Sequence, residues 1–292
     1  MLRSYRLIAL ALIVAALFAL AACGSDDDDD DGGGSANTTE EKASACAKDQ
    51  LETQSPGTLT VGTDKPAFPP YFEDDDPTNG KGFESAVAYA VADELGFDKA
   101  DVKWTVVPFN SSYAPGPKDF DFDINQISIT PPREKVVDFS RPYYVAPQAV
   151  VVGKGSDLAN VQTLADLEDA TIGVQIGTTS LDAAQQVINP LEEVKVFNDS
   201  NDVVTALKQN QVDAVVVDLP TAFYLTAAQV PGSKIVGQFS APGGDSFGLL
   251  FAKGSTLTPC ADQALDKLES SGQLEEITNR WMGAAAGAPE LR

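Results

Sequence analysis

Histidine is absent from this sequence, and basic residues are scarce in it. The 292 residues include 20 Lys and Arg against 43 Asp and Glu, which gives a formal charge of −23. The absence of histidine excludes Ser-His-Asp and Cys-His catalysis and any His-ligated zinc site. The acidic balance argues against nucleic acid as a partner, because phosphate binding needs a basic surface. Function must therefore come from carboxylates, arginine, hydroxyls, amides, aromatic rings and the backbone, and we expect neither a metal nor another cofactor.

The first 22 residues have the pattern of a signal peptide. Arg3 and Arg6 give a positive start, and residues 7–22 form an unbroken apolar run of 16 residues. The run is shorter than the roughly 20 residues of a membrane span and suits a signal-peptide core. Its end, Leu20-Ala21-Ala22-Cys23, resembles a bacterial lipobox, in which Cys23 takes the lipid and becomes the mature N-terminus. We therefore expect an extracytoplasmic protein that is lipid-anchored to the cell membrane; an ordinary secretory signal and a transmembrane anchor are the alternatives.

Residues 23–45 have the composition of a disordered acidic and glycine-rich tether. Asp26 to Asp31 is a block of like charges, and Gly32 to Gly34 follow it. Such a block repels itself and buries no apolar surface, so a flexible linker is expected. A calcium site is the alternative, but the run suggests no folded ligand geometry.

Two cysteines remain beyond the lipobox, Cys46 and Cys260. Export places them in an oxidising compartment, where an even pair predicts a disulfide. The bridge would close a long loop, which favours a large stabilisation. Two unpaired, buried thiols are the alternative.

The body of the chain alternates strand and helix patterns in two blocks. In the first block, strand patterns lie at residues 59–63, 102–106 and 124–129, and a helix starts near Gly82 and ends at Gly96. In the second, strand patterns lie at 171–175, 194–197, 214–217, 234–237 and 248–251, with helical patterns at 181–187, 203–207 and 220–228 and in two final helices. This alternation predicts an α/β protein with two lobes.

Three segments resemble one family. They are Gly82 to Val87 with Glu94-Leu95-Gly96, Ile127 to Tyr144, and Gln211 to Asp218 with Pro220. The second is long and specific: Ile-Ser-Ile-Thr-Pro-Pro-Arg-Glu-Lys-Val-Val-Asp-Phe-Ser-Arg-Pro-Tyr-Tyr. Together they resemble the polar amino acid-binding proteins of ABC importers, solute-binding protein family 3. The resemblance covers about residues 57 to 283, in order.

The resemblance implies a two-lobed clamshell of the periplasmic-binding-protein type II. Lobe 1 would hold residues 46–150 and 244–292, and lobe 2 residues 151–243. The chain would cross near Ala149–Val152 and again near Ser240–Gly244, with the ligand in the cleft and closure by a hinge motion. Cys46 and Cys260 would both belong to lobe 1.

The resemblance also implies the groups that hold an amino acid. Arg133 occupies the position that binds the α-carboxylate, for which a guanidinium offers a planar fork of donors. Ser128 matches a position that supplies a backbone or hydroxyl contact, and Thr178 and Thr179 begin a helix beside the same carboxylate. Asp218 stands at the ammonium-binding position. A surface arginine, helix capping by the threonines and an N-cap role for Asp218 are the alternatives.

The chain departs from the family pattern around the side-chain pocket. Phe68 and Phe109 match aromatic positions that sandwich the ligand, with lobe-core packing as the alternative, and Asp64 matches a position that touches ligand side chains. Gln126 stands where the family usually has a small residue, often glycine, so it would fill part of the pocket or bond to the ligand. Residues 111–122, which contain Pro115-Gly116-Pro117, also depart.

The resulting hypothesis is a monomeric receptor that binds a glutamine- or glutamate-like amino acid and delivers it to an ABC permease. The partners would be that ligand, the transmembrane subunits of the permease and the membrane that holds the lipid on Cys23. It would not be an enzyme. A cyclohexadienyl dehydratase-like enzyme on the same fold, using Glu84 or Asp64 as a general acid, and an amino-acid sensor are the alternatives.

Overall fold

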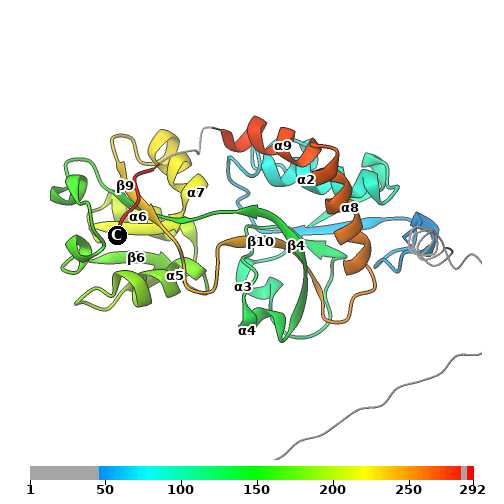
Figure 1. The fold of residues 1–292 in the computed structure, drawn as a ribbon, viewed down its shortest axis with the longest axis horizontal. Helices are drawn as coiled ribbons and strands as arrows, with labels where there is room; N and C mark the ends of the chain where they lie inside the picture. Colours follow the sequence, from blue (N-terminus) through cyan, green and yellow to red (C-terminus); the bar gives the residue numbers. More distant parts are fainter. Residues whose placement is uncertain (1–45, 284–287) are drawn as a thin grey trace, which may run out of the picture. The chain divides into compact units, whose positions relative to one another are not determined.

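The computed structural model describes residues 46–283 and 288–292, which lie in one compact unit. The expected signal peptide, Cys23 and the acidic tether lie outside the described residues. Within the described residues the strands form two five-stranded sheets (Figure 1). None of the helices in this part of the chain has the length and apolar character needed to cross a membrane.

The first sheet has the strand order β2-β1-β3-β10-β4. Its strands are β1 (Leu59–Thr63), β2 (Val102–Val106), β3 (Phe122–Asp123), β4 (Val137–Val145) and β10 (Ser246–Ala252). β1 runs parallel to β2 and β3, whereas β10 is antiparallel to β3 and β4. The accompanying helices are α2 (Phe83–Glu94), α3 (Phe109–Ser112), α4 (Pro131–Glu134), α8 (Thr258–Ser270) and α9 (Gln273–Met282). The main core joins the apolar faces of α2 and α8 to β1 and β10.

The second sheet has the strand order β7-β6-β8-β5-β9. Its strands are β5 (Gln148–Val152), β6 (Ile172–Gln175), β7 (Lys195–Phe197), β8 (Ala214–Asp218) and β9 (Lys234–Phe239). Its helices are α5 (Thr179–Ala183), α6 (Ser200–Lys208) and α7 (Leu219–Tyr224); π-helical turns, η6 (Ala184–Ile188) and η7 (Leu225–Gln229), continue α5 and α7. Alternate residues of β5 enter two apolar cores, Val150 and Val152 on one face, Ala149 and Val151 on the other. Burial on both faces explains the continuous apolar run in this strand.

Short 3-10 turns complete the described structure. They are η1 (Lys48–Gln50), η2 (Pro77–Asn79), η3 (Lys99–Asp101), η4 (Asp157–Asn160) and η5 (Ala165–Leu167).

The strand expected over residues 124–129 is wrong in position. β3 covers only Phe122–Asp123, and Ser128 makes an isolated bridge to Phe247. Between them Gln126 takes a φ of 49°, in the left-handed region, which breaks the extended path. The isoleucine pattern therefore reflects burial of Ile124 and Ile127 and does not mark a continuous strand.

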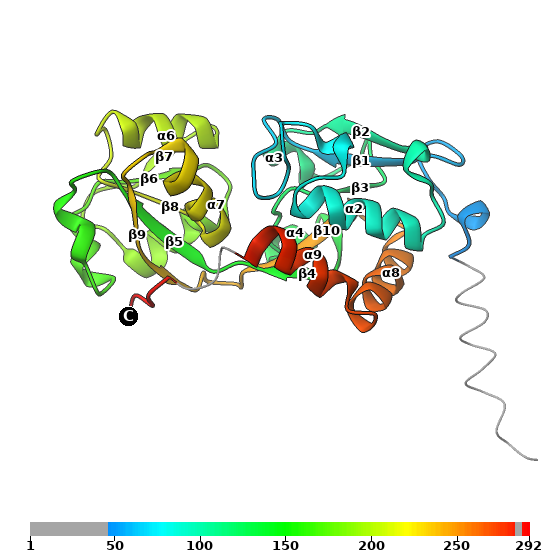
Figure 2. The ribbon, with the colours of Figure 1, turned by 90° about the horizontal axis from the view of Figure 1, so that it is seen from above.

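Two segments connect the sheets side by side (Figure 2). The first lies between β4 and β5, and the second between β9 and β10. The amide of Ala146 donates to the carbonyl of Asp245 (2.8 Å), which joins the two crossings. Ala149–Val152, where the first crossing was expected, lie inside β5 of the second sheet, so that crossing comes earlier in the chain.

The last described residues, 288–292, lie on the second sheet, although the whole stretch 244–292 was expected in lobe 1 (Figure 1). Glu290 bridges Gln238 of β9, and the amide of Leu291 donates to the Gln238 carbonyl (2.9 Å). Leu291 is 5% exposed and packs into the core of this sheet beside Gly237, where a Cβ would lie 2.4 Å from the Leu291 Cγ. An edge strand offers unpaired backbone groups, and the tail uses them.

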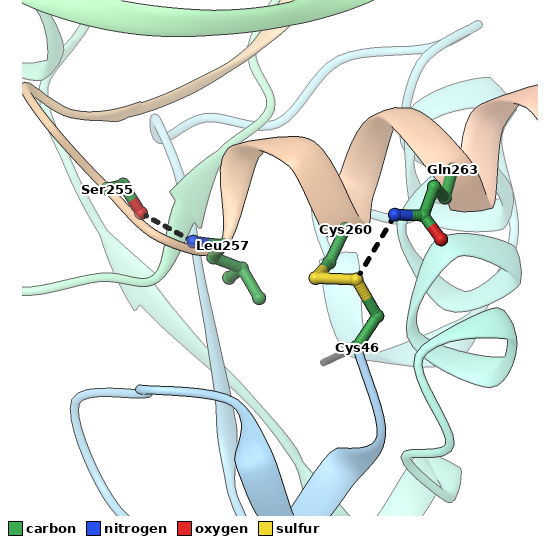
Figure 3. The surroundings of a disulfide bond; sticks show 5 residues. All are labelled: Cys46, Ser255, Leu257, Cys260 and Gln263. Carbon is green, nitrogen blue, oxygen red and sulfur yellow. Dashed lines mark hydrogen bonds between the residues drawn. A yellow bond between two sulfur atoms is a disulfide. The ribbon is translucent and has the colours of Figure 1, made fainter. Parts of the chain in front are cut away.

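The structure joins Cys46 to Cys260 of α8 in a disulfide (Figure 3). The sulfur atoms lie 2.02 Å apart, the Cα atoms 5.4 Å apart, and the residues are 214 positions apart in the chain. The amide of Gln263 lies 3.4 Å from the Cys46 sulfur. The bridge fastens the start of the described chain to a helix of the main core.

Replacing Cys46 and Cys260 together by serine is expected to lower the free energy of unfolding by about 2–5 kcal/mol, because the bridge shortens a very long loop in the unfolded chain. Denaturant unfolding of the oxidised protein and of the double variant measures the difference. Reaction of the denatured, unreduced mature protein with a thiol reagent is the direct control. Two reactive thiols from these positions would contradict the bridge.

Candidate ligand-binding site

A cleft between the two sheets is lined by residues from both of them. It encloses about 1120 Å³ of empty space, part of it open solvent. All of the ligand-binding residues expected from the sequence line this cleft: Asp64, Phe68, Phe109, Gln126, Ser128, Arg133, Thr178, Thr179 and Asp218. The structure therefore brings together side chains that are up to 154 positions apart in the sequence, between Asp64 and Asp218.

Arg133 is the cationic group of the cleft. It lies in α4 and is only 8% exposed. Its Nη1 donates to the carbonyl of Ser128 (2.7 Å) and its Nη2 to the carbonyl of Gly177 (2.8 Å), which belongs to the segment after β6. The guanidinium carbon also lies 4.6 Å from the ring centroid of Tyr113 and 5.6 Å from that of Phe109. These contacts fix the plane of the guanidinium and use two of its five N–H donors, so others remain for an anion.

The start of α5 lies opposite Arg133. Thr178 is the N-cap: its hydroxyl accepts from the amide of Leu181 (3.2 Å) and donates to the carbonyl of Gln175 (2.8 Å). Helix capping, the alternative raised for this threonine, is thus observed, and Thr178 lines the cleft as well. The hydroxyl of Thr179 lies 3.2 Å from that of Ser128, so the two sides of the cleft touch here.

Asp218 is the anionic group on the second side of the cleft. It ends β8 and precedes α7, which has Pro220 in its first turn. Although Asp218 occupies the N-cap position, its side chain makes no capping hydrogen bond. Its Oδ1 accepts from the Nε2 of Gln148 (2.8 Å) instead. Burial raises the pKa of Asp218 to about 7, the bond from Gln148 opposes that rise, and the nearby Asp245 carboxylate adds to it.

Aromatic rings form two walls of the cleft. Phe68 faces Tyr224 across it, with ring centroids 6.2 Å apart, and Phe109 packs edge-on against Tyr113 at 5.6 Å. Phe68 and Phe109 are both half-buried and both line the cleft, so neither belongs wholly to a core. The hydroxyl of Tyr71 lies 3.3 Å from that of Thr221, which is a further contact between the two sides.

Gln126 is held by a buried carboxylate. Its amide donates to the Oε1 of Glu84 (2.7 Å), and its side-chain Nε2 bonds the other oxygen of Glu84. The hydroxyl of Tyr143 also donates to Glu84 (2.5 Å). Burial raises the pKa of Glu84 to about 7, although these hydrogen bonds oppose the rise. The positive φ of Gln126 explains why a glycine is well suited to this position.

Asp64 also lines the cleft. Its carboxylate accepts from the amides of Lys65 (2.7 Å) and Phe109 (3.1 Å). The side chain is therefore fixed by the backbone on which Phe109 is carried.

Several cleft residues were not expected from the sequence. They are Asn125, Gln175, Thr221, Tyr224 and Gln229, together with Gln148 behind Asp218. The side-chain amide nitrogen of Asn125 is buried and has no hydrogen-bond partner within the described part of the chain. Gln148 had a usable signal: it is a polar residue in the apolar run from Ala146 to Val152. The others lie in segments whose place around a cleft depends on the tertiary fold.

Comparisons with known proteins agree on one group. Residues 59–284 match the family model of bacterial extracellular solute-binding proteins, family 3. The arginine-binding extracellular protein ArtP of Bacillus subtilis (strain 168) is 28% identical over 244 residues, which cover 82% of this chain and 91% of ArtP.

Solved structures add the fold. An ancestral arginine-binding protein bound to glutamine is similar with a TM-score of 0.66 and 34% identity, over 79% of this chain and 100% of that one. The ancestral amino acid-binding protein AncCDT-1, a precursor of cyclohexadienyl dehydratase, is similar with a TM-score of 0.64 and 30% identity, over 77% of this chain and 95% of that one. The predicted two-lobed α/β fold is thereby confirmed.

Proposed function

The chain belongs to the bacterial extracellular solute-binding proteins of family 3, and we propose that it captures a glutamine-like amino acid in its cleft and delivers it to an ABC permease. The family consists of amino acid-binding extracellular proteins, and the relatives described above are named for binding, not for catalysis. Capture and release without bond chemistry is therefore the activity that we infer.

One observation carries the proposal: Arg133 and Asp218 line the same cleft from opposite sides. An amino acid is a zwitterion, so it needs a bidentate cation for its carboxylate and an anion for its ammonium group. Arg133 retains free N–H donors, and the carboxylate of Asp218 is not used to cap α7. A ligand bound to both would bridge the two lobes and stabilise the closed form.

The rest of the cleft disfavours an acidic ligand side chain. Among the described residues that line it, Arg133 is the one cation, and Asp64 and Asp218 are the two anions. A glutamate ligand would use Arg133 for its α-carboxylate and leave the side-chain carboxylate without a cation, which is costly in a cleft. The amide groups of Asn125, Gln175 and Gln229 suit a side-chain amide. Glutamine is therefore the first candidate.

The sequence supports a location outside the cytoplasm. The apolar run before Cys23 and the lipobox-like end support a lipid-anchored protein outside the cytoplasm, tethered by residues 23–45. Delivery of ligand would then take place at the membrane surface, with the protein acting as a monomer.

A dehydratase-like activity is the second candidate, because the fold is similar to a precursor of cyclohexadienyl dehydratase. It would need a carboxyl group that donates a proton near neutral pH. Burial gives Glu84 a pKa of about 7, which suits a general acid. Yet Glu84 is fully buried behind Gln126 and is not among the cleft-lining residues, which favours the binding function.

A thermal-shift screen of the soluble body, residues 46–292, against the twenty amino acids and arogenate-type acids tests the proposal. Ligand that binds only the folded state raises the melting temperature by mass action, and we expect glutamine to give the largest rise. Turnover of an arogenate-type acid would favour the enzyme instead. The absence of any shift with every amino acid would overturn the proposed function.

A further inference from the structure

Gln148 is a fully buried polar residue at the place where the chain enters the second sheet. It is the first residue of β5, has no exposed surface, and pairs with Asp218 of β8 and Phe239 of β9 in the ladder. Ala146, two residues earlier, is bonded to the other crossing segment at Asp245. Gln148 therefore lies next to the crossings and next to the anionic group of the cleft.

Both ends of the Gln148 side-chain amide are hydrogen-bonded. Its Nε2 donates to Asp218 Oδ1 (2.8 Å), and its Oε1 accepts from the hydroxyl of Ser180 (2.5 Å). These partners fix the amide orientation, because an ionised carboxylate only accepts and needs the NH₂ end. Ser180 follows Thr179 in α5, on the side of the cleft that faces Arg133. One amide thus connects the strand end that carries Asp218 to the helix start opposite the guanidinium.

The charges around Asp218 explain why a donor is needed there. The nearby Asp245 carboxylate raises the pKa of Asp218, and Arg133, across the cleft, lowers it. The charge of Asp218 also raises the pKa of Glu84, Tyr71 and Tyr144. Burial raises the pKa of Asp245, while hydrogen bonds from the amide of Ala241 (3.1 Å), in the second crossing, and from the Gln148 side chain oppose that rise. A buried carboxylate with another one nearby is ionised only when donors compensate it.

We propose that Gln148 is a positioning residue for ammonium recognition. Held by Ser180, it orients the Asp218 carboxylate and favours its ionised form, without touching the ligand itself. The inference rests on the proposed function in that it assigns the ammonium to Asp218. It adds a residue that belongs neither to the family motifs of the sequence nor to the lining of the cleft. Through its two hydrogen bonds this residue connects the start of α5 to Asp218.

The first test needs no ligand. In protein with ¹³C-labelled aspartate, the titration of the Asp218 carboxyl is followed by NMR, with Asp218→Asn used to assign the signal. We expect Gln148→Met, which keeps the volume and deletes the donor, to raise the midpoint by roughly one pH unit or more, since a hydrogen bond to a charged group is worth about that much. Ser180→Ala, which leaves Gln148 in place but frees its far end, should raise it by less.

Gln238→Met is the matched control, because it makes the same change on the neighbouring strand β9, outside the cleft. It should leave the Asp218 midpoint unchanged. A Gln148→Met midpoint equal to that of the wild type overturns the inference. Should that variant not fold, an unchanged midpoint in Ser180→Ala overturns it equally.

Calorimetry with L-glutamine and with glutaramic acid, its analogue without the α-amino group, separates this inference from the proposed function. Gln148→Met should weaken glutamine about tenfold more than the analogue at pH 6, because only glutamine uses the Asp218 carboxylate. Equal weakening of both would mean a merely structural role for Gln148. Failure of the wild type to bind any amino acid would refute the proposed function, while the NMR titration would still decide the role of Gln148.

Discussion

Arg133→Ala is expected to remove most of the affinity for amino acids. The cleft would lose its one cation among the described lining residues, and an α-carboxylate would enter a largely desolvated site without a partner. Removing one member of a buried, hydrogen-bonded charge pair costs about 2–5 kcal/mol, which corresponds to a loss in affinity of roughly 30-fold to several thousandfold. Isothermal titration calorimetry with the amino acid selected in the screen gives the number.

Arg133→Lys refines this expectation. Lysine keeps the charge but replaces the planar fork by a point charge, so it cannot reproduce the bonds to Ser128 and Gly177 together with a bidentate carboxylate contact. We expect an affinity between those of the wild type and the alanine variant. Arg141→Ala is the matched control, because Arg141 pairs with Asp266 and Glu269 outside the cleft. Unchanged affinity in Arg133→Ala would refute the site, provided that its melting curve shows a folded protein.

The chemistry of the site was easier to predict than its surroundings. Arg133, Ser128, Thr178 and Asp218 were expected because the segments that contain them resemble those of family 3, and the structure places all four on one cleft. Their roles in binding stay predictions. Gln148 was missed because its function depends on which strand β5 pairs with, and a local pattern does not specify its pairing partner.

Two of the errors in the fold have physical causes of the same kind. The expected strand over residues 124–129 fails because a single residue, Gln126, adopts a left-handed φ, which side-chain hydrophobicity does not report. The tail with Leu291 was expected in lobe 1 because the family resemblance assigned the whole stretch 244–292 to that lobe. Its preference for β9 comes from unpaired backbone groups at a sheet edge, and these exist only once the second sheet has formed.

Amino acid binding is expected to weaken as the pH falls below about 7, and Asp218 is the reason. Burial raises the pKa of this carboxyl from 3.8 to about 7 in the empty protein, so at pH 6 most molecules carry a proton there. The ligand's ammonium group needs the carboxylate, and binding must then release the proton. Affinity should fall by up to tenfold for each pH unit below 7 and stay level just above it.

The stability of the empty protein should show the opposite dependence. Between the unfolded value of 3.8 and the folded value of about 7, the folded state holds more protons at Asp218 than the unfolded state does. The free energy of unfolding contributed by this group therefore falls as the pH rises through that window. Glu84, whose pKa burial also raises to about 7, adds a dependence of the same sign. Ligand should thus stabilise the protein most at and above neutral pH.

The variant Asp218→Asn distinguishes the effect of the Asp218 carboxyl from that of the Glu84 carboxyl. The asparagine has no proton to release, so binding of the remaining weak ligand should lose its pH dependence, while the Glu84 contribution to stability stays. The variant should also lose far more affinity for α-amino acids than for their analogues without the amino group, because only the former have an ammonium to place. Calorimetry from pH 5 to 8 with both kinds of ligand decides the matter: equal losses for the two, or a pH dependence that persists in Asp218→Asn, would assign the ammonium site to another group.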